Sequence, residues 1–263
     1  MKYRMFIVLA VFSLQAQAES VRLGMAGNFA VLAGTTITNT GPSNINGGDI
    51  GVYAGSSITG FPPGIVAPPY IIRSADAFTL QAKNDLTAAY ITAAGLSPTT
   101  DLTGIDLGGL TLTPGVYSFS SSAFLTGTLT LNDLGDPNAQ FVFQMGSTLV
   151  TASNSSVVTI NGGSNPGSTV FWQVGSSATL GTGTAFEGHI LALTSITMTT
   201  GASILNGSAL ARNGAVTLDT NRINNSIAAP APLPTSAMMG LGLFVVGLAR
   251  KLWKYQNDRL CRL

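Results

Sequence analysis

Short segments with threonine at fixed places recur through the second half of the chain. The segments STLVTAS (147–153), ATLGTGT (178–184), TMTTGA (197–202) and VTLDTN (216–221) superpose. They place threonine in two columns, the first with Thr148, Thr179, Thr197 and Thr217 and the second with Thr151, Thr182, Thr200 and Thr220. Successive members of the second column lie 31, 18 and 20 residues apart. A repeat of about 18–20 residues with one insertion is typical of a β-solenoid, in which each coil stacks on its neighbours.

The residues beside the threonines predict which side chains face the interior. Alternate residues of a strand point to opposite faces, so we expect Leu149, Leu180, Met198 and Leu218 inside and the threonine columns outside. Neighbouring strands would hold the threonines in rows about 4.7–4.9 Å apart. A β-sandwich would instead use turns every 8–12 residues without such a register. An uncharged threonine surface is unusual, because solvated faces normally carry Lys, Glu, Asp and Arg.

One segment has the pattern of a helix. Residues 75–94 follow Ser74, a suitable N-cap, and precede Gly95, a suitable stop. Apolar side chains recur at steps of three and four along it, at Phe78, Ala82, Leu86, Ala89 and Ala93. The small alanines predict close packing of this helix on a flat sheet.

Charge and residue counts exclude several classes of function. Only 9% of the residues are charged, against about 25% in a typical soluble domain. Between Leu23 and Ile227 four basic residues stand against nine acidic ones, a net charge of −5. Nucleic-acid binding needs clustered Lys and Arg, which this body lacks. Cys261 and His189 are the only residues of their kinds, so we expect no disulfide, no classical metal site and no cofactor.

The two ends of the chain resemble targeting signals. Residues 1–18 have a basic start, an apolar stretch and Ala16-Gln17-Ala18, which together are typical of a signal peptide. A proline-rich spacer (228–236) precedes an apolar segment with a basic tail (237–263). This tail resembles the exosortase-type (PEP-CTERM-like) sorting signals of Gram-negative bacteria, and a membrane anchor is the alternative. We expect an exported protein, extracellular or attached to the cell envelope.

The body between these ends, residues 19–227, resembles a known family. Six ordered blocks carry the similarity: 27–52, 58–64, 101–131, 135–153, 170–202 and 206–221. They are similar to the microbial ice-binding (antifreeze) proteins. The resemblance implies an irregular, discontinuous right-handed β-solenoid of triangular cross-section with one long helix packed alongside. It also implies a monomer whose partner is an ice crystal surface.

The family resemblance also implies where ice would be bound. Relatives repeat a Thr-(Ala/Gly)-x-(Thr/Asn) motif on a flat face, which residues 151–154 match fully and residues 40–43 and 200–203 match with serine in the last place. With the two threonine columns, the expected ice-binding residues are Thr40, Ser43, Thr148, Thr151, Asn154, Thr179, Thr182, Thr184, Thr197, Thr200, Ser203, Thr217 and Thr220. The sequence leaves open which face of the solenoid carries the activity.

Two other functions remain open from the residues. A surface adhesin or matrix module would share the export signals, and β-helices also host polysaccharide-acting enzymes. The best catalytic pair is Glu187 with His189, two residues apart and so expected on one side of a strand. Asp133 with Asp136 is a second pair, although its composition favours a turn. Trp172 is expected to pack in the core or at a coil edge rather than to stack on a sugar. We expect no enzymatic activity.

Overall fold

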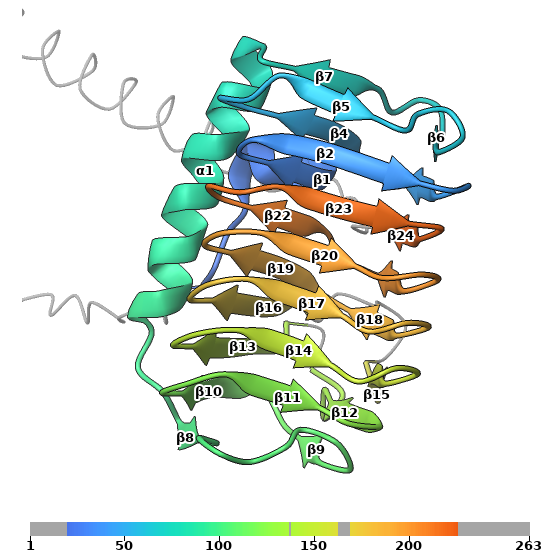
Figure 1. The fold of residues 1–263 in the computed structure, drawn as a ribbon. Coiled ribbons are helices and arrows are strands. Elements are labelled where there is room, and N and C mark those ends of the chain that lie inside the picture. Colours follow the sequence, from blue (N-terminus) through green and yellow to red (C-terminus); the bar gives the residue numbers. More distant parts are fainter. Residues whose placement is uncertain (1–19, 137, 163–168, 226–263) are drawn as a thin grey trace, which may run out of the picture. The chain divides into compact units, whose positions relative to one another are not determined.

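The computed structural model describes residues 20–136, 138–162 and 169–225. The chain divides into two compact units, Met1–Ile227 and Ala228–Leu263, and every described residue belongs to the first. That unit is a solenoid of three parallel sheets, which we name A, B and C (Figure 1). The predicted signal peptide, the spacer and the apolar tail lie outside the described residues. Among the residues that are described, no helix has both the length and the apolar character needed to cross a membrane.

The strands of each sheet follow one another in a fixed order along the stack. Sheet A contains β7 (Ile72–Ser74), β4 (Asp49–Val52), β1 (Phe29–Ala33), β22 (Ala209–Ala211), β19 (His189–Ala192), β16 (Thr169–Val174), β13 (Gln140–Met145), β10 (Gly115–Phe119) and β8 (Thr100–Asp101). Sheet B contains β11 (Ala123–Leu125), β14 (Leu149–Thr151), β17 (Ala178–Leu180), β20 (Ile196–Met198), β23 (Val216–Asp219), β2 (Thr36–Thr40) and β5 (Ser57–Thr59). Sheet C contains β6 (Ile65–Val66), β3 (Asn44–Asn46), β24 (Arg222–Asn224), β21 (Ser203–Leu205), β18 (Ala185–Glu187), β15 (Ser156–Ile160), β12 (Thr128–Asn132) and β9 (Thr111–Leu112).

The chain does not climb the stack in one pass. Its first coils, from β1 to β7, form one end of the solenoid, and the long helix α1 (Ala77–Gly95) then runs along the side of the stack to the other end (Figure 1). The later coils return from β8 to β24, and the last of them docks on the first through β22–β1, β23–β2 and β24–β3 pairing. The predicted discontinuous solenoid with one helix is therefore confirmed.

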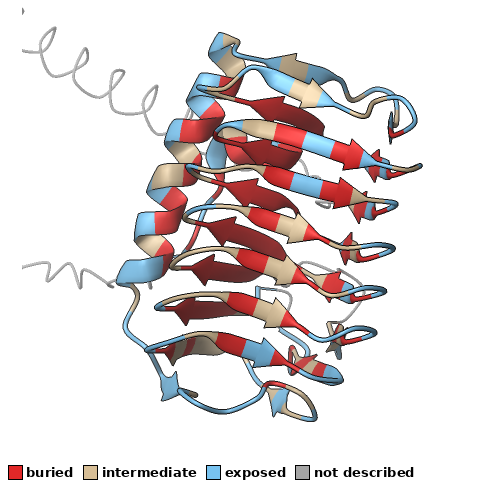
Figure 2. Ribbon diagram, in the orientation of Figure 1, coloured by how far each residue is buried: buried red, intermediate tan, exposed pale blue. Residues whose placement is uncertain are grey.

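Apolar side chains from all three sheets fill the interior, and Figure 2 shows buried residues along the strands of the stack. The four predicted interior residues, Leu149, Leu180, Met198 and Leu218, are all fully buried. Aromatic rings stack along the axis beneath sheet A, and the centroids of Phe143 and Trp172 are 4.0 Å apart with nearly parallel planes. Trp172 Nε1 donates to the carbonyl of Glu187 at 3.0 Å, so its one polar atom is satisfied. This confirms that Trp172 is a core residue.

Helix α1 covers the outer face of sheet A. The 3₁₀ helix η1 (Gly24–Asn28) lies beside it. The N-cap is Asp76, whose Oδ1 accepts from the amide of Thr79 at 2.7 Å, and not the predicted Ser74. The alanine and leucine stripe is buried against the sheet as expected, while Phe78 is only half-buried.

The sequence pattern missed a buried charged residue of α1. Lys83 is buried, and its Nζ donates to the carbonyls of Ala211 and Arg212 at the end of β22. The lysine therefore ties the helix to the middle of sheet A.

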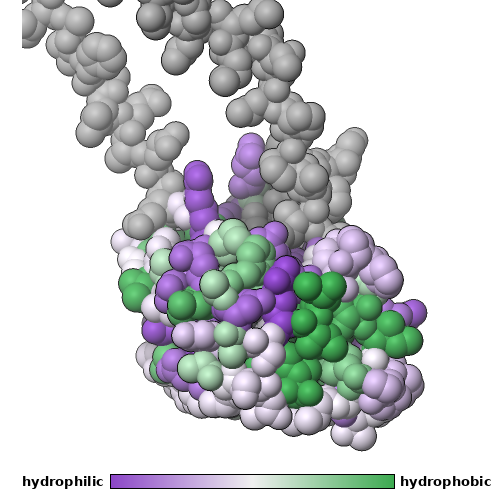
Figure 3. All heavy atoms as spheres, turned by 90° about the horizontal axis from the view of Figure 1, so that it is seen from above, coloured by the Kyte–Doolittle hydropathy of each residue, from purple (hydrophilic) through white to green (hydrophobic). Residues whose placement is uncertain are grey.

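The end of the stack formed by β5, β6 and β7 carries unpaired strand edges. Ile65, Ile71 and Ile72 are exposed there, and Figure 3, which looks onto this end, shows apolar side chains gathered on it. Two proline pairs, Pro62-Pro63 and Pro68-Pro69, flank the edge strand β6. Because proline cannot donate to a strand ladder, these pairs protect the edge from further strand pairing.

Candidate functional site

Of the three outer faces of the solenoid, that of sheet B is the one left both open and nearly uncharged. Sheet A is covered by α1, which buries Leu32, Val142 and Leu191 on its outer side. Sheet C carries a groove of about 600 Å³ whose lining includes the charged Glu187 and Arg222 and the exposed Leu205. Sheet B has no helix or loop over it among the residues that the structure places. Its outward side chains form three rows across the strands.

The central row of sheet B consists mainly of threonine. The residues in register, from β5 to β11, are Thr59, Thr38, Thr217, Thr197, Thr179, Val150 and Phe124. Five successive strands therefore present threonine at the same height, at the strand spacing of about 4.8 Å. Thr38 Oγ1 donates to Thr217 Oγ1 at 3.4 Å. No other described residue hydrogen-bonds the Oγ1 atoms of Thr179 and Thr197, which are free to bind water.

A second row lies two residues earlier on each strand and holds only small side chains. Its members are Ser57, Thr36, Ala215, Ser195, Ser177, Thr148 and Ser122. The hydroxyl of Ser177 accepts from the amide of Ser195 at 3.3 Å, and the hydroxyl of Ser195 accepts from the amide of Ala215 at 3.2 Å. These bonds fix the serine rotamers, so the row is rigid as well as flat.

The third row lies at the edge of sheet B next to sheet C. It contains Thr40, Asp219, Thr199, Gly181, Ala152 and Thr126. Asp219 is the one charged residue of the three rows, and its carboxylate accepts from the hydroxyls of Thr200 and Thr220. Thr199 Oγ1 donates to the carbonyl of Leu180 at 2.8 Å. This row is more irregular than the other two.

The first predicted threonine column is correct for three of its four members. Thr179, Thr197 and Thr217 share the central row, but the residue of β14 in register with Thr179 is Val150, not Thr148. Leu149 pairs with Ala178 rather than Leu180, so the segment 147–153 was aligned two residues out of register. Thr148 stands in the second row instead.

Thr151 faces inward, against prediction, because it lies two residues after the interior Leu149 on β14 and therefore on the same side of the strand. Its side chain is buried, with Oγ1 2.8 Å from Thr184 Oγ1 and accepting from the amide of Gly181 at 2.9 Å. A buried threonine is tolerated because its hydroxyl is fully hydrogen-bonded. The prediction that Thr151 faces outward is wrong.

Ser43 and Thr184 also lie inside rather than on the surface. They belong to a column of buried small and polar side chains at the corner between sheets B and C, which comprises Ser155, Thr184, Ala202, Asn221 and Ser43. Ser43 Oγ accepts from the amide of Asn221 at 2.8 Å, and Asn221 Nδ2 donates to the carbonyls of Thr199 and Ala202. These polar groups satisfy the backbone where each coil bends, so they cannot contact a surface ligand.

The remaining predicted residues are spread over the corner and sheet C. Thr182, Thr200, Thr220 and Asn154 are exposed on the turns after sheet B, with Asn154 and Thr220 at positive φ. Thr40 ends β2 beside them, whereas Ser203 is half-buried on sheet C. The prediction missed Thr36, Thr38, Ser57 and Thr59. The alternation in Thr36-Ile37-Thr38-Asn39-Thr40 was the available signal for two of them, Thr36 and Thr38.

The structure does not support a catalytic arrangement for either candidate pair. Glu187 ends β18 in sheet C and His189 begins β19 in sheet A, with Gly188 at φ +102° turning the chain between them. The prediction that they lie on one side of the same strand is therefore wrong. His189 is buried 2.8 Å from Ser208 Oγ, and burial lowers its pKa to about 4. Asp133 and Asp136 stand in a turn whose residues Leu134 and Gly135 have positive φ, which confirms the turn interpretation.

Comparisons with known proteins agree on one family. A family model described as "Ice-binding-like" matches residues 31–224. An ice-binding protein of Nostoc sp. (strain HG1) is 56% identical over 257 residues, which cover 94% of this chain and 93% of that protein. A crystal structure of an ice binding protein from an Antarctic biological consortium is 46% identical with a TM-score of 0.72, covering 81% of this chain and 96% of that one. One from the Antarctic ascomycete Antarctomyces psychrotrophicus is 40% identical with the same TM-score, covering 79% and 99%.

Proposed function

Because the chain belongs to the ice-binding-like family, we propose that it adsorbs to ice through the outer face of sheet B. The observation that carries the assignment to this face is the central row, in which Thr59, Thr38, Thr217, Thr197 and Thr179 stand in register on five neighbouring strands. Among the described residues, no other outer face combines openness, small side chains and so little charge.

The chemistry of threonine supports this assignment. Each side chain offers a hydroxyl that hydrogen-bonds a surface water and a methyl group around which water orders. Rows about 4.8 Å apart, with alternate residues about 6.7 Å apart along a strand, form a two-dimensional grid. Waters held on such a grid form a sheet that can merge with the ice lattice.

Rigidity makes many weak contacts effective together. Each contact is worth on the order of 1 kcal/mol or less. The strands of sheet B pair on both sides along most of the stack and rest on a packed core, so adsorption orders few groups that were free before. Adsorbed molecules pin the ice front and curve it, which lowers the local freezing point and slows recrystallisation.

A bulky substitution in the centre of the grid tests the proposal. In Thr197→Tyr the ring would hold ice away from Thr197 and from its row neighbours Thr179 and Thr217. Three contacts at about 0.5–1 kcal/mol each amount to about 1.5–3 kcal/mol, so the concentration needed to inhibit recrystallisation should rise at least about tenfold. The matched control is Thr130→Tyr, on β12 of sheet C, which should retain full activity.

Thermal hysteresis and recrystallisation inhibition are measured for the wild type and both variants, with circular dichroism as the folding check. Loss of activity in Thr197→Tyr alone supports the assignment. Equal loss in both variants contradicts the choice of face. A folded but inactive wild type contradicts ice binding and leaves the surface-adhesin alternative.

We further propose that the protein is exported as a monomer without catalytic activity and is released from the cell or retained at its envelope. The signal-peptide pattern of residues 1–18 and the apolar, basic ending of residues 237–263 support this proposal. The N-terminal sequence of the mature protein and its distribution between medium and membrane fractions test it. A protein that keeps residue 1 and stays in the cytoplasm would contradict it.

A further inference from the structure

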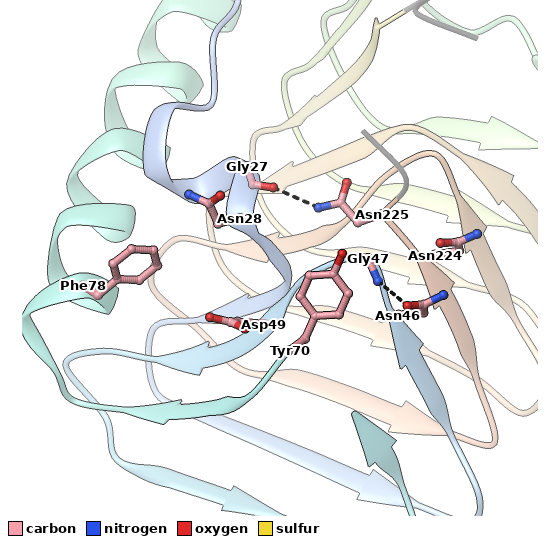
Figure 4. Close-up of a pocket in the computed structure, with 9 residues that line it drawn as sticks. All are labelled: Gly27, Asn28, Asn46, Gly47, Asp49, Tyr70, Phe78, Asn224 and Asn225. Atoms are coloured by element: carbon pink, nitrogen blue, oxygen red, sulfur yellow. Dashed lines mark hydrogen bonds between the residues drawn. The ribbon is translucent and has the colours of Figure 1, made fainter. Parts of the chain in front are cut away.

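A second feature of the molecule lies away from sheet B, at the corner between sheets C and A. A cavity of about 530 Å³ opens there, lined by Gly27, Asn28, Asn46, Gly47, Asp49, Tyr70, Phe78, Asn224 and Asn225 (Figure 4). The lining comes from η1, from the turn between β3 and β4, from the segment before β7, from the start of α1 and from the end of β24. The volume falls within the range of small-molecule sites, about 300–1,000 Å³.

The walls of the cavity are held together by hydrogen bonds of Asn225. Asn225 Nδ2 donates to the carbonyls of Gly27 and Phe29 at 3.0 and 3.1 Å, and the Asn225 amide donates to the Asn46 carbonyl at 3.0 Å. Gly47, at φ +80°, lies so close to this strand end that a Cβ would stand 2.5 Å from the Asn225 carbonyl carbon. The cavity is therefore preformed and has a glycine where a side chain would not fit.

The charges in the lining are already neutralised. Asp49 is the one charged lining residue, and its Oδ2 accepts from Arg73 Nε at 2.6 Å while its Oδ1 accepts from the amide of Ile71 at 2.9 Å. Arg73 also pairs with Asp76 at 3.2 Å. A cation would have to compete with Arg73 for the carboxylate, and an anion would find no unpaired base in the lining. The cavity is thus suited to a neutral ligand.

The remaining groups combine amides with aromatic rings. Asn28, Asn46 and Asn224 bring side-chain amides. Asn28 Nδ2 donates to the carbonyl and the sulfur of Met25, and Asn46 Oδ1 accepts from the amide of Gly47 at 2.8 Å. The Asn28 oxygen, the Asn46 nitrogen and both polar atoms of the Asn224 side chain are left to match hydroxyl groups. The ring of Tyr70 points into the space between Asp49 and Gly47, and Phe78 closes the opposite side (Figure 4). Among the described residues, neither the Tyr70 hydroxyl nor the side-chain amide of Asn224 has a hydrogen-bond partner. The rings of Tyr70 and Phe78 offer apolar contact to the C–H face of a sugar.

We propose that this cavity binds a neutral saccharide, at the size of one or two sugar units, independently of the ice-binding face. The cavity lining shares no residue with the three rows of sheet B. A sugar bound there would leave the rows free, so the protein could hold a glycan and an ice surface at once.

Ligand-observed saturation-transfer NMR tests this proposal on the full-length protein. The probes are glucose, galactose, N-acetylglucosamine and trehalose at millimolar concentration, with glucuronate and glucosamine as charged comparators. The variants are Tyr70→Ala, which removes the ring, and Asn224→Ala, which removes an amide. Ile71→Ala is the control, because Ile71 is exposed next to Tyr70 but does not line the cavity.

We expect at least one neutral sugar to bind the wild type and Ile71→Ala, and its affinity to fall about tenfold or more in Tyr70→Ala and Asn224→Ala. Recrystallisation inhibition should be unchanged in all three variants, which also verifies their fold. If one cavity variant fails to fold, the other decides. Absence of binding to the wild type, stronger binding of a charged sugar, or unchanged binding in a folded cavity variant would overturn the proposal.

Discussion

Acidification should weaken the fold through His189. The imidazole is buried, lies 2.8 Å from Ser208 Oγ and packs against the ring of Phe171 with centroids 5.5 Å apart. Burial lowers its pKa from 6.5 to about 4. Between these pH values the unfolded chain binds a proton that the folded protein does not bind, so stability falls as the pH falls through this window. Each pKa unit is worth about 1.4 kcal/mol, which makes the loss roughly 3 kcal/mol by pH 4.

Thermal unfolding at a series of pH values measures this loss. For a domain of about 200 residues, 3 kcal/mol corresponds to a fall in Tm of roughly 6–12 °C. His189→Gln keeps a polar group for Ser208 but does not titrate, so its Tm should change much less between pH 6.5 and 4. The carboxyl groups of Asp76, Asp101 and Asp106, whose pKa values are lowered by hydrogen bonds, are common to both proteins and titrate below this window. Parallel pH profiles for the two proteins would contradict the role of His189 in this loss of stability.

Three further substitutions have expected outcomes. Val150→Thr extends the row of threonines by one coil, so recrystallisation inhibition should reach its midpoint at about half the protein concentration that the wild type needs. An unchanged or higher midpoint would count against the central row as the contact surface. Asp219→Asn removes the one charge of the three rows and keeps an acceptor for Thr200, so ice activity near neutral pH should rise, and weaker activity would show that the carboxylate itself contributes. Lys83→Met removes two hydrogen bonds between α1 and sheet A and should lower the unfolding free energy by about 2 kcal/mol, measured by urea unfolding, without changing ice activity at low temperature.

The sequence predicted the stacked coils because the threonine repeat is most regular where successive coils of the chain are also neighbours in the stack. The steps from β17 to β20 to β23 keep one register, so Thr179, Thr197 and Thr217 were correctly placed together. The pairing of β2 with β23 joins Thr38 to Thr217 across 179 residues of sequence. No local pattern marks such a contact, so the sequence did not place Thr38 in one row with Thr217, although the alternation in residues 36–40 indicated its exposure.

Orientation at the corners was harder to predict than position along the strand. Strict alternation ends where a coil bends, and a polar residue there can face inward if it satisfies the backbone. Ser43 and Thr184 do so, although serine and threonine are more often surface residues. The family motif places these residues in the right coils but does not distinguish the hydroxyl that faces water from the one that holds the turn.

The most direct test of ice adsorption through sheet B is the retention of fluorescently labelled protein on a single ice crystal while the surrounding solution is exchanged. If sheet B is the adsorbing face, the wild type and Thr130→Tyr stay on the crystal after the free protein is washed away. A double variant, Thr38→Tyr with Thr197→Tyr, should leave with the solution because both halves of the central row are held off the ice. Retention of the folded double variant, or loss of the wild type, would contradict the account.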